Sequence, residues 1–195
     1  MIRLITALCK RLIEELDEAQ INQDTIDKYI HHGKECPHCG SVGTLESYGG
    51  YSRSLTFRRK GKTVDSIVWI RRFECSSCGE THALLPDILT PYSIYSLRFK
   101  LLVITAYFER GCSVAALCES FDIAVSTLYE WKKLLIYHKD LMIGVLKSKK
   151  TSSLEFLHSL IYSEGLSDIL HRFFSKYRFS FMQGASSSAA QSVPP

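Results

Sequence analysis

The fold is decided by two short stretches, Cys36-Pro37-His38-Cys39-Gly40 and Cys75-Ser76-Ser77-Cys78-Gly79. Each places two thiols two residues apart and follows them with a glycine, which permits the sharp turn with positive φ that is needed after the second thiol. A tetrahedral zinc ion takes four ligands such as thiolates at about 2.3 Å, and one tight turn with this spacing supplies two of them. The sequence therefore predicts one structural Zn²⁺, with a ligand set of Cys36, Cys39, Cys75 and Cys78.

The chain between the two cysteine pairs has the pattern of a β-hairpin. Residues 51–58 and 64–73 alternate and are rich in strand-forming side chains. The turn Arg59-Lys60-Gly61-Lys62 separates them, and its glycine suits a tight reversal. Antiparallel pairing of these strands would return the second pair of cysteines to the first. We expect a zinc ribbon over residues 33–86.

This hairpin is also the most basic part of the sequence, and aromatic residues are interleaved with its cations. Positive charge that follows phosphates, next to rings that can stack, is typical of a nucleic-acid-binding surface. The alternative is a solvated charged face over core aromatics. The cations expected to contact DNA are Arg53, Arg58, Arg59, Lys60, Lys62, Arg71 and Arg72.

The cysteine pairs have two other readings. Cys-x-x-Cys can be a redox dithiol, but such motifs open a helix in a βαβ pattern, and here both pairs precede glycine in turn-rich sequence. His38 and His82 are alternative ligands, although four thiols already suffice. Four protein ligands leave no position for an activated water, so the metal is expected to be structural and the protein not to be an enzyme.

Composition fits a globular protein. The 195 residues are 46% hydrophobic and 23% charged, and the formal net charge of +4 permits a nucleic-acid partner without requiring one. The seven cysteines are an odd number, which suits a reducing cytosol better than a disulfide scaffold. No targeting segment and no membrane-spanning segment is expected.

A helix-turn-helix is predicted over residues 87–140, and it makes the fold class α+β, an antiparallel ribbon followed by an all-α region. Ser113 can cap a short helix, Asp122 tolerates the left-handed conformation of a turn, and Ser126 can cap a third helix that runs to about His138. Leu128 and Trp131 lie on the inner face of that helix. The alternative is a plain helical hairpin.

In a DNA-bound helix-turn-helix the third helix enters the major groove by its N-terminal end. A helical wheel places Ser126 and Glu130 opposite the core, and a Glu can accept a hydrogen bond from cytosine N4. The residues expected to face DNA on this helix are Ser126, Thr127, Tyr129, Glu130, Lys132 and Lys133.

The flanking segments are expected to be helical or disordered. Residues 1–32 form a helical arm with Leu4, Leu8, Leu12 and Ile13 aligned, a break at residues 21–24, and Asp24 as a second cap. Residues 81–95 form a connector in which Pro86 and Pro91 oppose regular helix. The remaining expected segments are C-terminal helices over residues 141–183 and a disordered tail over residues 184–195.

The run from Arg71 to His82 resembles the N-terminal zinc ribbons of bacterial insertion-sequence transposases, which carry a similar aromatic-Cys-x-x-Cys-Gly-x-Thr run and are commonly followed by a helix-turn-helix. The continuation Thr81-His82-Ala83-Leu84-Leu85-Pro86 is also similar to an uncharacterised bacterial family, a domain of unknown function. The resemblance covers residues 36–138. It implies DNA binding linked to mobile elements, whereas the acidic catalytic domain of such transposases is not expected in this chain.

These observations lead to one main expectation and one alternative. The main one is a zinc-dependent protein that binds double-stranded DNA as a transposase-related accessory factor, a truncated transposase or a transcriptional regulator. Its expected place is the cytoplasm, associated with the nucleoid, with a homodimer or a transposase as a further partner and no membrane. The alternative is a protein–protein interaction adaptor that contains a structural zinc ribbon.

Overall fold

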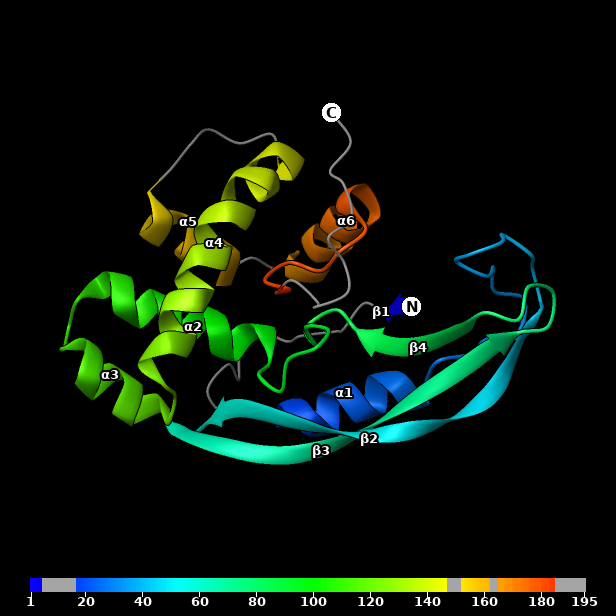
Figure 1. The fold of residues 1–195 in the computed structure, drawn as a ribbon, viewed down its shortest axis with the longest axis horizontal. Helices are drawn as coiled ribbons and strands as arrows, with labels where there is room; N and C mark the ends of the chain where they lie inside the picture. The colour runs from blue at the N-terminus through cyan, green and yellow to red at the C-terminus, as the bar shows by residue number, and fades with distance from the viewer. Residues whose placement is uncertain (5–16, 147–151, 162–164, 185–195) are drawn as a thin grey trace.

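A long β-hairpin runs along one side of the molecule (Figure 1), and its strands are β2 (Leu45–Arg59) and β3 (Lys62–Cys75). The computed structural model describes residues 1–4, 17–146, 152–161 and 165–184. The strands pair antiparallel from Leu45↔Cys75 to Arg59↔Lys62. Positive φ at Lys60 (48°) and Gly61 (72°) gives the two-residue turn whose twist matches that of paired strands. The predicted hairpin is confirmed, with strands longer than expected at both ends.

Two further strands complete a sheet of order β1-β4-β3-β2. β4 (Thr81–Pro86) pairs antiparallel with the end of β3, and β1 (Ile2–Leu4) pairs parallel with β4. The expected connector therefore begins after residue 86 rather than at residue 81, and the expectation of a helix is wrong for residues 2–4. Both corrections have one physical cause, since an open strand edge presents backbone groups that a neighbouring strand can satisfy.

Helix α1 (Glu18–Asp27) covers part of the sheet and is continuous through the break expected at residues 21–24. Asp17 caps it by accepting a hydrogen bond from the Gln20 amide at 3.2 Å, and Asp24 lies inside the helix rather than at a second cap. The helix packs against β3, where the Trp69 amide donates to Gln23 Oε1 at 2.8 Å. The expected apolar face formed by Leu8, Leu12 and Ile13 lies outside the described residues.

Three helices follow the sheet: α2 (Leu97–Glu109), α3 (Val114–Phe121) and α4 (Val125–Leu146). Ser113 caps α3 by accepting from the Ala116 amide, and Asp122 adopts the left-handed conformation (φ 52°, ψ 55°), both as predicted. Ser126 is not a cap, because the Leu128 amide already donates to the Ala124 carbonyl and α4 begins at Val125.

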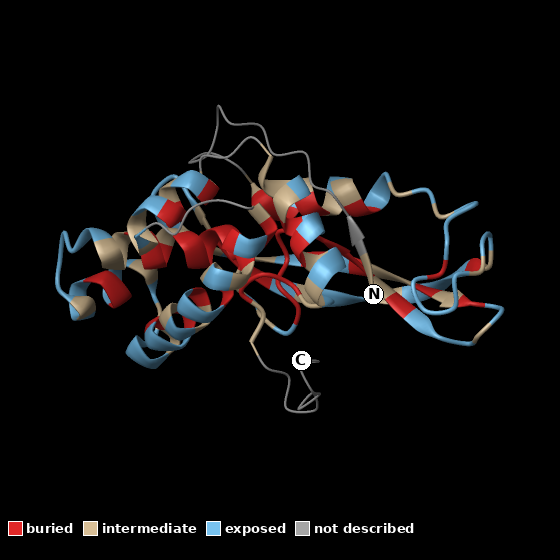
Figure 2. Ribbon diagram, turned by 90° about the horizontal axis from the view of Figure 1, so that it is seen from above, coloured by how far each residue is buried: buried red, intermediate tan, exposed pale blue. Residues whose placement is uncertain are grey.

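The C-terminal helices share a core with these three. α5 (Ser153–Ile161) and α6 (Leu166–Tyr177) bury Leu157 and Phe173 in the same cluster as Leu128 and Trp131. α4 therefore continues past residue 140, where a boundary was expected, since its later turns bury side chains against α6. A second core lies between the sheet and α1. In Figure 2 the buried residues extend from the helices through the middle of the molecule, and the loops at the end farthest from the helices are mostly exposed.

The two cores are joined through contacts of α1 and β2 with residues 94–98, where α2 begins. The Thr56 amide donates to the Ile94 carbonyl at 2.7 Å, and the Ser96 amide donates to the Thr56 carbonyl at 3.0 Å. Glu18 is fully buried, with its Oε1 atom 3.8 Å from Arg98 Nη1. Burial raises the pKa of Glu18 to about 7, although a hydrogen bond with Ser96 and the charge of Arg98 act in the opposite direction.

This pKa makes stability depend on pH. The folded chain holds the Glu18 proton more tightly than the unfolded chain, so the stabilisation is complete below the unfolded pKa of 4.5 and is lost as the pH rises to about 7. As the pH rises from 5.5 to 8, we expect the ionisation of Glu18 to lower the free energy of unfolding by about 2 kcal/mol.

Urea unfolding across that range measures the effect. The variant Glu18→Gln should remove this part of the pH dependence whatever its absolute stability, while Glu46→Gln, at an exposed position of β2, should leave the profile unchanged. Parallel profiles for the wild type and Glu18→Gln would contradict the assignment.

Candidate functional site

The four predicted cysteines meet at the base of the hairpin. All four Sγ atoms lie within 4.8 Å of one another, with Cys36 and Cys78 3.9 Å apart and Cys39 and Cys75 3.7 Å apart. Metal–sulfur bonds of about 2.3 Å in a tetrahedron place sulfur atoms about 3.8 Å apart. The donor set and its spacing therefore fit one tetrahedral metal ion, as the sequence predicted.

The backbone of each knuckle repeats the same turn. The Gly40 amide donates to the Cys36 carbonyl at 2.9 Å, and the Gly79 amide donates to the Cys75 carbonyl at 2.8 Å. Both glycines have positive φ, 77° and 71°, as the turn after each second thiol requires. A hydrogen bond from the Ser76 amide to the Thr44 carbonyl, at 2.9 Å, holds the second knuckle beside the first.

The pKa shifts of Cys39, Cys75 and Cys78 favour a bound cation. A hydrogen bond with Ser41 lowers the pKa of Cys39 to about 6, and one with the Thr44 hydroxyl, 3.1 Å from the sulfur, lowers that of Cys75. The Glu80 backbone amide acts to lower the pKa of Cys78, but burial and the three neighbouring thiols raise it to about 12. Without a cation the last thiol keeps its proton, so a metal that binds four thiolates must displace it.

Two hydroxyl groups beside the thiols were not predicted from the sequence, and two histidines were left as alternative metal ligands. The hydroxyls of Ser41 and Thr44 were not predicted, and the only sequence signal was their position just after the first knuckle. His82, an alternative ligand in the sequence, is buried with Nε2 3.3 Å from Cys36 Sγ. Among the described residues, the cluster with metal-ligand spacing contains cysteines alone, so His82 supports a ligand rather than being one; His38 is exposed.

The outward face of α4 carries most of the residues expected to meet DNA there. Ser126, Glu130 and Lys133 are exposed, and Tyr129 is 46% exposed. Thr127 is half-buried. Lys132 is held against α2 instead, because its Nζ donates to the Tyr107 hydroxyl at 2.9 Å and lies 4.8 Å from the centre of that ring.

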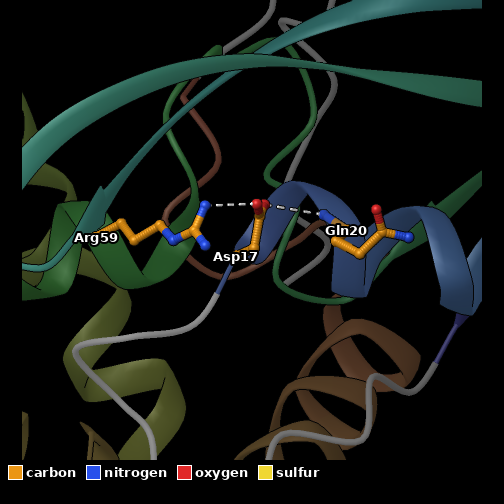
Figure 3. Close-up of polar contacts among 3 residues, drawn as sticks. All are labelled: Asp17, Gln20 and Arg59. Carbon is orange, nitrogen blue, oxygen red and sulfur yellow. Dashed lines mark hydrogen bonds and ion pairs between the residues drawn. The ribbon is translucent and has the colours of Figure 1, made fainter.

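The cations of the hairpin are spread along its length, and its arginines have partners within the protein. Arg59 forms an ion pair of 2.9 Å with Asp17, the cap of α1 (Figure 3). Arg58 donates to the Ser120 carbonyl at 2.7 Å and lies 4.1 Å from the centre of the Phe121 ring.

The other three arginines hold loops and helices in place. Arg53 donates to the carbonyls of Thr90 and Ser93, and Arg72 donates to the Thr81 hydroxyl at 2.9 Å. Arg71 lies 3.4 Å from the carbonyl of Ile26, in the last turn of α1, and 3.4 Å from that of Tyr29, just after the helix. The two lysines of the set, Lys60 and Lys62, lie at the turn and are exposed.

A family model described as a domain of unknown function (DUF6431) matches residues 36–131. The match begins at the first of the four clustered cysteines and ends at Trp131 in α4, so it spans the cysteine cluster, the hairpin and the start of α4. The expected similarity to an uncharacterised family is confirmed, and the resemblance to transposases remains a prediction. No curated protein and no solved structure matches the chain.

Among the helices of the described part of the chain, none combines the length and the apolar character required to cross a bilayer.

Metal removal tests the site directly. We expect one metal ion per chain, and we expect Cys75→Ser to abolish stoichiometric binding because the remaining three thiols leave the tetrahedron open. Cys112→Ser is the matched control, since this exposed thiol lies outside the cluster. The readouts are metal analysis of the purified protein and amide hydrogen exchange after chelation.

Chelation should increase exchange at residues 36–82 more than in α2, α3 and α4, because the helical core is separate from the metal site. Unchanged protection at the base of the hairpin in the metal-free chain would show that the four cysteines do not hold a structural metal.

Proposed function

We propose that the protein is a zinc-dependent, double-stranded-DNA-binding protein in which α3 and α4 act as a helix-turn-helix. The observation that carries the proposal is the left-handed Asp122 turn between a short helix capped by Ser113 and a long helix with an exposed face. Leu117 and Cys118 of α3 and Leu128 and Trp131 of α4 are buried together. This is the packing that fixes a reading helix beside its partner helix.

In this proposal the N-terminal half of α4 enters the major groove. Ser126 and Glu130 face the base edges, where hydroxyl and carboxylate groups can distinguish donors from acceptors. Thr127, half-buried at the rim of this face, adds a methyl and a hydroxyl. Lys133 lies one turn after Tyr129 and supplies charge toward a phosphate, which positions the helix without reading sequence.

The metal has a structural part in the same proposal. Four thiolates are the ligand set typical of structural zinc, and they leave no open position for a reacting water or substrate. We therefore assign zinc as the metal and binding, not catalysis, as the function. The similarity of the run from Arg71 to His82 to transposase ribbons supports a role linked to mobile elements, as an accessory factor, a truncated transposase or a regulator, acting at the nucleoid.

A second candidate function is favoured by the later turns of α4. Ile136 and Tyr137 are 52% and 56% exposed. They line a shallow groove of about 580 Å³ together with Tyr129, Lys133 and Asp140. Exposed apolar side chains in a groove are typical of a protein-binding surface, so an adaptor that binds a partner protein through α4 is the alternative.

Selection of bound oligonucleotides from a random duplex pool, with zinc-loaded protein, tests the first candidate. We expect an enriched motif, and we expect Glu130→Ala to weaken binding to it by about 5- to 150-fold while binding to an unrelated duplex stays within about twofold. Glu46→Ala, an equal change of charge at an exposed site on β2, should leave both affinities unchanged. A pool that enriches no motif would contradict sequence-specific reading.

Substitution in the later turns of α4 separates the two candidates. Ile136→Glu places a charge in the groove, so it should abolish partner binding if α4 is an adaptor surface and should change the selected DNA motif little if the N-terminal half reads DNA. Pull-down of interacting proteins by the wild type and this variant, next to their duplex affinities, measures both effects. If Ile136→Glu leaves the bound proteins unchanged, the adaptor is excluded at this groove.

A further inference from the structure

The tip of the hairpin is attached to the end of α3. Arg58, just before the tip, donates to the Ser120 carbonyl at 2.7 Å, and Thr63, just after it, donates to the Phe121 carbonyl at 3.1 Å. These two contacts reach across 62 and 58 residues of sequence to the last residues of α3. The tip is therefore fixed to the helical unit at the carbonyl end of α3, where orphan backbone acceptors need donors.

The turn at the tip of the hairpin leaves two lysines, Lys60 and Lys62, exposed to solvent. Arg59 and Lys62 are paired across the end of the ladder, and Lys60 and Gly61 form the two-residue turn with positive φ. Both lysines are exposed, and no hydrogen bond or ion pair joins either ammonium group to another residue of the described chain. Because both strands are docked through Arg58 and Thr63, the tip presents its charges at a fixed place.

That place is next to the start of the proposed reading helix. Phe121 precedes the Asp122 turn, and α4 begins three residues later at Val125. In Figure 1 the tip of the hairpin lies at the end of α3 from which α4 departs. Positive charge at the tip and the exposed N-terminal half of α4 therefore belong to one end of the molecule.

We propose that the Lys60-Gly61-Lys62 tip is a second DNA contact, which binds backbone phosphates beside the major groove that α4 enters. This inference rests on the proposed function, since it assigns the tip to the same duplex. Lysine ammonium groups are compact charges without the planar fork that reads guanine, so the tip adds affinity and position, not sequence preference. Arg58 is a positioning residue, because its guanidinium is used to hold the tip on α3.

The same arrangement separates the metal from the DNA. The knuckles lie at the base of the hairpin and the lysines at its tip, and the 15 residues of β2 span a path of about 50 Å. The zinc end is thus away from the duplex, and it acts on binding through the strands that it closes.

The salt dependence of duplex affinity tests the proposal. Each neutralised phosphate contributes a slope of about −0.9 to log K against log salt concentration, so Lys60→Ala with Lys62→Ala should make the slope shallower by about 1.8 on selected and unrelated duplexes alike. The control is Lys28→Ala with Lys34→Ala, which removes the same charge from exposed positions near the zinc end and should leave the slope within experimental error. Zinc content and circular dichroism verify that both double variants are folded.

The outcomes distinguish this inference from the proposed function. If the tip variant has the same slope as the control while Glu130→Ala still relaxes sequence preference, the tip is not a DNA contact and the helix-turn-helix function stands. A tip variant that changes the selected motif would show base reading and would overturn the assignment to phosphates. A wild-type protein that binds no duplex would overturn both.

Discussion

Four sulfur atoms within 4.8 Å of one another are the constraint on which the base of this molecule depends. The pKa of Cys39 is lowered and that of Cys78 is raised, because burial and the neighbouring thiols oppose ionisation of Cys78. A metal ion bound by the four sulfur atoms would remove this opposition and close a loop that contains both hairpin strands. A two-stranded ribbon has little stability of its own in water, so closure at the base would add to the stability that β4 and α1 give the hairpin.

Those other contacts explain why the hairpin can be long. α1 lies against β3, β4 pairs with its metal-proximal end, and Arg58 and Thr63 attach the tip to α3. The hairpin therefore connects the metal site to the helical core as a strut attached at both ends. The buried Glu18 of α1 lies beside Arg98 of α2, and this contact connects the two helices. Burying the two polar groups has a desolvation cost that an apolar contact would not have.

The parts of the structure that the sequence predicted are those set by local chemistry. The spacing of the cysteine pairs, the Ser113 cap and the left-handed Asp122 each follow from a few neighbouring residues. The corrections at residues 2–4 and beyond residue 140 involve partners distant in sequence, whereas those at Asp24 and Ser126 concern only which neighbouring residue begins a helix. Residues 2–4 are a strand because β4 offers an edge, and α4 continues past residue 140 because α6 covers it.

The arginines of the hairpin show most directly that contacts between residues distant in sequence could not be predicted. In the sequence, Arg53 and Arg58 count as free positive charge, but in the fold they satisfy carbonyls of residues 90, 93 and 120. A count of cations cannot reveal this, since each partner is more than 30 residues away. The lysines of the turn differ because a two-residue reversal at the end of a strand pair has few neighbours.

The family match covers the hairpin together with the helices that contact its tip. Residues 36–131 include both knuckles, both hairpin strands, β4, α2, α3 and the first turns of α4. Both ends of the hairpin and the helix whose start lies beside its tip are thus inside one matched segment, whereas α1, α5 and α6 lie outside it. The hairpin connects the two halves of this segment, because Arg58 and Thr63 attach the ribbon to α3. A function located on α4 would therefore depend on the metal through the position of the hairpin, without any contact between the metal and the bound molecule.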